Sequence, residues 1–121
     1  MTKAIDIKEK LTSITAYWTP YIAARVNDHY VKLARLNGEF VWHSHESEDE
    51  LFLVVRGELF LDFRDKTVVV GAGQMYVVPR GVEHKPRTGP QGADVVLFEP
   101  VTTRHTGSTI SDRTVDKLDW I

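Results

Sequence analysis

Three histidines and one glutamate carry the clearest chemical signal in this chain. They are His43, His45, Glu50 and His84. Imidazole nitrogens together with one carboxylate oxygen form a ligand set that divalent first-row transition metals accept. We therefore predict that these side chains bind one divalent metal ion as a cofactor. Ligand type alone does not distinguish iron, manganese, nickel, zinc and copper.

The spacing of the first two histidines places them on the same side of an extended segment. Side chains alternate between the two faces of a strand, so a strand over Phe40–His45 points His43 and His45 in one direction. The same alternation puts Phe40 and Trp42 on the opposite face. Both imidazoles are expected to enter one space.

Glu50 and His84 must reach that space from other segments. Glu50 opens the next expected strand, after a short acidic loop at residues 46–49 that could fold back toward the histidines. His84 follows the turn-forming residues Pro79 and Gly81, which end another strand. Such turns could bring all four ligand candidates together.

From about Tyr21 onward, short runs rich in Val, Leu, Phe and Tyr alternate with turn residues. This rhythm is typical of an all-β barrel or sandwich. The candidate strands are Tyr21–Val26, Tyr30–Leu36, Phe40–His45, Leu51–Val55, Glu58–Phe63, Thr67–Val70, Gln74–Val78 and Ala93–Glu99.

A short amphipathic helix is expected before the first strand. Asp6 and Glu9 have the spacing of a capping box, and Ile7, Leu11 and Ile14 recur at helical spacing. After Pro100 the sequence becomes polar, and a loose tail is one prediction for this segment. The terminal pair Trp120 and Ile121 suggests the alternative, docking onto a groove or a partner subunit. The predicted organisation is a helix and lead-in over 1–20, a β-barrel over 21–100 and a polar tail over 101–121.

The candidate ligands belong to two motifs. The first consists of Gly38, His43, His45, Glu50 and Gly57. The second consists of Gly73, Pro79, Gly81 and His84. Together they resemble the paired motifs of the cupin superfamily, specifically its small single-domain members, over roughly Val31 to Glu99.

Two positions depart from the cupin pattern. Four residues separate Gly38 from His43 where the family usually has five, and Thr88 stands where asparagine is usual. Neither departure removes a ligand candidate. The resemblance implies a jelly-roll β-barrel whose metal is bound inside by His43, His45, Glu50 and His84.

Size and composition exclude several classes of protein. A chain of 121 residues that is 42% hydrophobic fits one domain. Its formal charge of −2, with scattered basic residues, disfavours nucleic acid as a partner. Because cysteine is absent, disulfides and thiolate ligands are excluded. No apolar run approaches the length of a membrane span, and no targeting signal is evident, so we expect a cytoplasmic protein without membrane contact.

The substrate pocket should be lined from the strands beside the ligands. Phe52 and Val54 lie on the same face of their strand as Glu50. In the strand that carries Met75 and Tyr76, either Met75 with Val77 or Tyr76 with Val78 should face the same cavity. We take Phe52, Val54, Met75 and Tyr76 as candidate lining residues, with the Tyr76 hydroxyl as a group that could act on a small-molecule substrate.

Three cations, Arg80, Lys85 and Arg87, flank His84 and could attract an anionic substrate, although exposed cations on a turn are more often plain surface. His29 and His105 lie outside both motifs and are expected at the surface.

The apolar run Leu51–Val55, together with Phe40 and Trp42, predicts a sheet face that needs covering. A homodimer formed through this face is one prediction. Coverage by the N-terminal helix or the C-terminal tail of the same chain is the alternative.

Three functions remain open. The metal could act in a dioxygenase, or as a Lewis acid in a sugar-isomerase-like enzyme, or in a non-catalytic binding or sensing module. No general base other than Glu50 itself is evident, which favours oxygen chemistry or binding. Because imidazoles bind metal as neutral bases, we expect metal affinity to fall as the pH drops through about 6.5.

Overall fold

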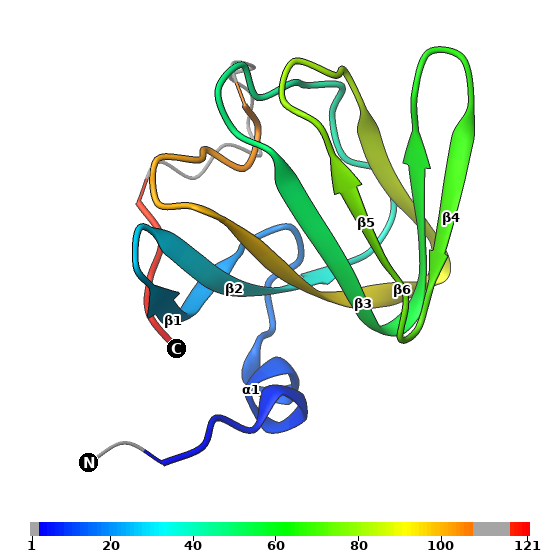
Figure 1. Ribbon diagram of the computed structural model, residues 1–121. Helices are drawn as coiled ribbons and strands as arrows, with labels where there is room; N and C mark the ends of the chain where they lie inside the picture. Colours follow the sequence, from blue (N-terminus) through cyan, green and yellow to red (C-terminus); the bar gives the residue numbers. More distant parts are fainter. Residues whose placement is uncertain (1–2, 108–116) are drawn as a thin grey trace.

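A computed structural model describes residues 3–107 and 117–121 (Figure 1). These residues form one short helix and six strands, all paired in antiparallel fashion. The elements are α1 (Ile7–Ser13), β1 (Tyr21–Val26), β2 (His29–Leu36), β3 (Glu50–Asp62), β4 (Thr67–Gly71), β5 (Met75–Val78) and β6 (Lys85–Pro100). The strand order is β1-β2-β6-β3-β4, with β5 paired to β3. The predicted all-β fold with an N-terminal helix is confirmed.

Two long bent strands, β3 and β6, hold the sheet together. They pair along both halves, from Leu51 opposite Phe98 to Asp62 opposite Lys85, with irregular register around Gly57. The sequence predicted two strands, Leu51–Val55 and Glu58–Phe63, in place of β3, and it began the last strand at Ala93, whereas β6 begins at Lys85. Both predictions are wrong because glycines that mark turns also occur within bulged strands, so local sequence does not separate the two.

The interior of the sheet is filled by one apolar core. Inward-facing residues alternate along β3, where Phe52, Val54, Leu59 and Leu61 are all buried. Trp18 closes one side of this core and stacks on Phe40, with ring centroids 4.7 Å apart. The candidate ligands lie at the edge of this core.

The outer face of the sheet is covered by the same chain. Asp6 caps α1 by accepting a hydrogen bond from the Glu9 backbone at 3.0 Å, as the sequence predicted. On its buried side, α1 presents Leu11, which packs with Ile14, Leu33 and Val96. Leu53 and Val55 pack against this second cluster. Intrachain coverage, the alternative to a dimer, therefore accounts for the outer side of the apolar run in β3.

The last residues return to β1. The Ile22 backbone donates to Asp119 O at 2.9 Å and accepts from Ile121 N at 2.9 Å. The Trp120 ring meets Tyr30 edge-on at 5.9 Å, and Ile121 packs on the outer cluster. The predicted docking of the chain end takes place within this chain, beside β1 (Figure 1). Residues 108–116 of the predicted tail lie outside the described residues.

Candidate metal centre

The segment that carries the first two histidines is extended but is not a strand of the sheet. It pairs with the start of β6 through isolated bridges, Glu39 with Arg87 and His43 with His84, and not through a continuous ladder. The His43 and His84 backbones exchange two hydrogen bonds of 2.9 Å. Prediction of a regular strand over Phe40–His45 is thus wrong in form, because the segment lacks a continuous partner. The paired backbone still fixes these two ligand candidates side by side.

The face assignment along this segment also needs one correction. Trp42 lies outside, where the Arg64 guanidinium sits 3.7 Å from the centroid of its ring. Phe40, expected on the same outer face, is buried in the inner core and meets the His43 ring edge-on. Irregular backbone does not keep the strict alternation of side chains along a strand, so the predicted outward position of Phe40 is wrong.

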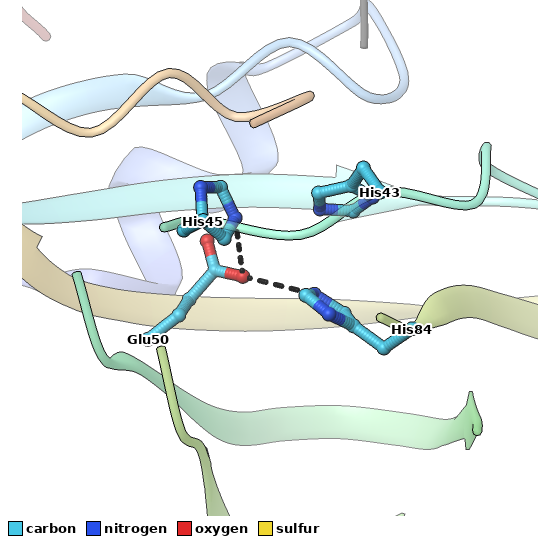
Figure 2. A group of neighbouring side chains, drawn as sticks. All are labelled: His43, His45, Glu50 and His84. Carbon is cyan, nitrogen blue, oxygen red and sulfur yellow. Dashed lines mark ion pairs between the residues drawn. The ribbon is translucent and has the colours of Figure 1, made fainter. Parts of the chain in front are cut away.

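All four predicted ligands come together in one buried cluster (Figure 2). One ligand atom from each of His43, His45, Glu50 and His84 lies within 4.8 Å of the others. The Glu50 oxygen Oε1 is 3.3 Å from His45 Nε2 and 3.4 Å from His84 Nε2. The donors belong to a loop, the first residue of β3 and the residue before β6. This cluster could hold a metal ion.

Hydrogen bonds to the backbone fix the tautomers of two imidazoles. His43 Nδ1 lies 2.9 Å from Val41 O, and His84 Nδ1 lies 3.0 Å from Val82 O. Because a carbonyl oxygen only accepts, each Nδ1 carries the proton and donates it. This leaves each Nε2 with an available lone pair, the arrangement that metal-binding histidines use.

The ring nitrogens that remain also fit a metal. Buried His45 Nδ1, His45 Nε2 and His84 Nε2 make no hydrogen bond with correct geometry to the described residues. Leaving buried polar atoms without partners costs free energy. A bound cation would satisfy the Nε2 atoms, so the donor set suits a metal better than it suits an empty core.

Burial and neighbouring charges alter the protonation of the cluster. Burial, followed by the charge of His84, lowers the pKa of His43 to about 4. Burial tends to raise the pKa of Glu50, but the close approach of the His45 and His84 rings outweighs it and holds that pKa well below its usual value. From the sequence we predicted that protons compete with the metal for the imidazoles near pH 6.5. At His43 this competition is expected at a lower pH, because burial disfavours the charged imidazolium and so lowers its pKa.

A buried ion pair lies behind Glu50. Lys32 Nζ donates to Glu99 Oε1 at 2.7 Å, with side-chain exposures of 1% and 0%. Burial and the negative charge of Glu50 raise the pKa of Glu99 well above its usual range, against the opposing charge of Lys32. Sequence reasoning missed this pair, since no local pattern links two residues that lie 67 positions apart.

Comparison with known proteins identifies the family. The family model described as Cupin domain matches residues 31–99, more than half of the chain. The chain belongs to the cupin domain family. With this match, the predicted cupin-type jelly-roll is confirmed.

Related proteins support the same assignment. Protein YdbB of Bacillus subtilis (strain 168) is 41% identical to this cupin over 86 residues, which cover 70% of each chain. The crystal structure of a cupin-2 domain protein from Shewanella frigidimarina is 41% identical, with a TM-score of 0.77, and the match covers 79% of this chain and 93% of that one. Protein NMB1881 from Neisseria meningitidis is 34% identical, with a TM-score of 0.73 and coverages of 81% and 99%.

A narrow apolar cavity adjoins the cluster of this cupin. His43 and Glu50 form part of its wall, and most of the remainder is hydrocarbon. The space open to the centre of a water-sized sphere is about 30 Å³. The other lining residues are Trp18, Pro20, Ala34, Leu36, Phe40, Phe52, Pro86, Val95, Leu97 and His105.

The structure places the predicted pocket residues in different environments. Phe52 lines the cavity, whereas Val54 is fully buried in the core beneath it. Tyr76 packs against the core and lies 6.0 Å from Phe63 between ring centroids. Met75 is 64% exposed, which corrects the prediction that it faces the cavity. Side chains alternate along β5, and Val78 lies in the core, so Met75 and Val77 point outward.

The cations around His84 are mostly paired with surface acids. Lys85 Nζ lies 2.7 Å from Glu39, and Arg87 Nε donates to Asp62 at 2.7 Å. Their charge is therefore offset locally, which weakens the suggestion that they attract an anionic substrate.

Among the described residues, no helix has the length and apolar character that a membrane span requires.

The two remaining histidines differ from each other. His29 is partly exposed and lies 2.8 Å from Asp28, while its ring stacks on Phe98. His105 is only 7% exposed and lines the cavity, so its predicted surface position is wrong. Neither cupin motif extends to residue 105. The return of the chain after β6 brings His105 to the cavity.

Proposed function

We propose that this cupin is a metal-dependent enzyme that uses dioxygen on a small, largely apolar molecule bearing oxygen ligands. The observation that carries the proposal is the position of the ligand cluster in the wall of an apolar cavity. His43, His45, Glu50 and His84 would hold one divalent ion, and iron is the metal best suited to this chemistry.

The ligand count supports catalysis over a purely structural role. Three imidazoles and one carboxylate would leave a six-coordinate ion two positions for small molecules. When bound, the metal would supply a site at which substrate oxygen and dioxygen can meet. The protein would supply a neutral His43 imidazole, a carboxylate ligand that is ionised at neutral pH and a largely apolar wall.

The cavity wall favours this chemistry over sugar isomerisation. A polyhydroxylated substrate in this cavity would leave several hydroxyl groups without hydrogen-bond partners, at a cost in affinity for each. A water needs about 10–15 Å³ of such space, so 30 Å³ holds two or three water-sized groups. Dioxygen fits this space, and a ring-shaped substrate of either class would require side chains of the wall to move, so the apolar lining and not the size of the cavity favours oxygen chemistry.

The first test is metal content. We expect the protein, purified without tag or chelator, to contain close to one iron per chain by elemental mass spectrometry. The double variant His43→Ala/His84→Ala should lose it. Absence of any first-row metal from the parent protein would contradict the proposal at its root.

The second test is oxygen uptake. Protein loaded with iron(II) should consume dioxygen in the presence of a catechol, a hydroquinone or a 1,3-diketone, and metal-free protein should not. Thermal stabilisation by one of these compounds without oxygen uptake would instead indicate a non-catalytic binding module. Turnover of a sugar without oxygen uptake would indicate the isomerase.

A further inference from the structure

Three buried charged side chains lie in a row across the sheet, and one of them is a ligand candidate. They are Lys32 on β2, Glu99 on β6 and Glu50 on β3. These strands lie side by side in the order β2-β6-β3 (Figure 1). Leu51 faces Phe98 in the antiparallel pairing of β3 with β6, and the continuation of this register brings Glu50 beside Glu99. None of the three charged side chains is more than 2% exposed.

Glu99 lies between the ammonium group and the ligand carboxylate. Lys32 Nζ donates to Glu99 Oε1 at 2.7 Å and, over a longer distance of 3.4 Å, to Thr103 O. The other carboxyl oxygen of Glu99, Oε2, is buried and makes no hydrogen bond with correct geometry to the described residues. Glu99 also interacts directly with Glu50, because burial and then the charge of Glu50 are the leading causes that raise the pKa of Glu99. Glu99 therefore links Lys32 to the metal cluster.

Packing alone does not account for this pair. The free energy needed to remove an ammonium and a carboxylate from water is close to what their attraction returns, and apolar residues of similar volume are often at least as stable. The position of the pair suggests a role at the cluster instead. Glu50 presents Oε1 to His45 Nε2 and His84 Nε2, at 3.3 and 3.4 Å, while Lys32 and Glu99 approach it along the sheet.

We propose that the Lys32–Glu99 pair positions Glu50, holding its carboxylate so that Oε1 points to the imidazoles and can bind the metal. Lys32 and Glu99 are positioning residues in this inference, because neither is among the four ligand candidates. The inference rests on the proposed metal site and goes beyond it by naming the residues that orient one ligand. Groups that contact a metal ligand from outside fix its direction, and their loss typically weakens metal binding roughly ten- to hundred-fold.

Two double variants of equal net charge test this role. Lys32→Met/Glu99→Leu replaces the pair with apolar side chains, whereas Lys32→Gln/Glu99→Gln keeps two groups that can form hydrogen bonds. Each variant removes one positive and one negative charge, so the two differ in whether a polar group still meets Glu50. Cobalt(II) is titrated into each metal-free protein, and the visible absorption gives the Kd and the spectrum of the bound ion.

We expect the apolar variant to bind cobalt(II) roughly ten- to hundred-fold more weakly than the parent. Its absorption bands should also shift, because a Glu50 side chain that is free to turn changes the coordination of the metal. The glutamine variant should stay within a few-fold of the parent and keep the parent spectrum. Val70→Ala is the control for stability, because Val70 is a core residue on β4, a strand that carries no ligand candidate. It should unfold at a lower temperature but keep the parent Kd and spectrum.

An apolar variant with the cobalt affinity and spectrum of the parent would overturn the inference. So would a glutamine variant as weak as the apolar one, because the pair would then act through its charges and not by placing Glu50. An equal loss of affinity in Val70→Ala would trace the effect to general stability and would overturn the inference as well. If Lys32→Met/Glu99→Leu does not fold, Lys32→Met/Glu99→Met decides in the same way.

Oxygen uptake separates this inference from the proposed function. If cobalt binding responds to the variants as expected, but the iron-loaded parent consumes no dioxygen with a catechol, a hydroquinone or a 1,3-diketone, the proposed function fails and the role of the pair stands. A parent protein that takes up no metal overturns both.

Discussion

His43 is a candidate ligand whose protonation the fold changes strongly. Its burial makes the imidazolium costly, which lowers its pKa to about 4. An unfolded chain would protonate the same residue near 6.5. Between these values the unfolded state binds the extra proton, so the His43 contribution to stability is complete above pH 6.5 and is lost as the pH falls toward 4.

Metal-free protein should therefore lose part of its free energy of unfolding between pH 6.5 and 4. The contribution of His43 is about 3 kcal/mol, since each pH unit between the two pKa values is worth about 1.4 kcal/mol. Glu99 acts in the opposite direction, because its raised pKa stabilises the folded state at low pH. The measurement is chemical denaturation across this range, in chelator-treated protein.

The variant His43→Asn isolates the contribution of His43 to the pH dependence of stability. It removes the imidazole but leaves Glu50 and Glu99 in place, so its stability should fall less steeply than that of the parent over the same pH range. Parallel curves for the two proteins would show that His43 is not the group responsible.

The turn after β6 is the element that the cupin motifs do not describe. Val101 N donates to Asp28 O at 2.9 Å, and Thr102 Oγ1 donates to Glu48 at 2.9 Å, so the turn bridges the start of β2 and the ligand loop. Gly107 has a positive φ of +57° at the point of closest approach. Its packing links the position of His105 to that of the ligands.

We predict that Gly107→Ala destabilises this turn and reduces metal retention. The new Cβ meets the Ser44 carbonyl and also strains a left-handed backbone, which alone costs about 1–3 kcal/mol. Gly73→Ala is the matched control, because Gly73 has a φ of +82° and no atom lies within 4 Å of the position that a Cβ would take there. Thermal unfolding and metal analysis measure both.

The control variant Gly73→Ala should lose stability through backbone strain but should keep its metal. If the two alanine variants lose equal stability and retain equal metal, then the contact between Gly107 and the ligand loop has no consequence for the site.

At the scale of the whole molecule, one chain covers much of its own sheet. α1 and Ile121 pack over the outer face of β2, β3 and β6, and Phe40 is inside. The surface that first suggested a homodimer is therefore largely used within the chain. Apolar side chains that are still exposed include Val69 on β4 and both Met75 and Val77 on β5.

A homodimer stays a prediction, and its test is the mass in solution. Light scattering at micromolar concentration should give twice the mass of one chain. Met75→Asp, in β5, should lower this mass if the exposed side of β4 and β5 forms the contact, whereas Ile5→Asp, near the N-terminus, should not. A parent protein with the mass of one chain would contradict the prediction.

The sequence by itself determined the chemistry of the site and the class of fold. His43, His45, Glu50 and His84 could be chosen as candidate ligands because residue type and motif spacing are local properties, and strand rhythm is local as well. The helix start at Asp6 followed from a capping pattern within four residues. These features need no knowledge of distant contacts.

The tertiary structure decided everything that depends on which distant segments meet. It turned two predicted strands into the bulged strand β3 and buried Phe40, while Met75 was left outside. It also joined Lys32 to Glu99 and brought His105 to the cavity across a chain return that no motif describes. Long-range packing selects among conformations that local sequence permits equally, so these contacts became visible only when the barrel closed.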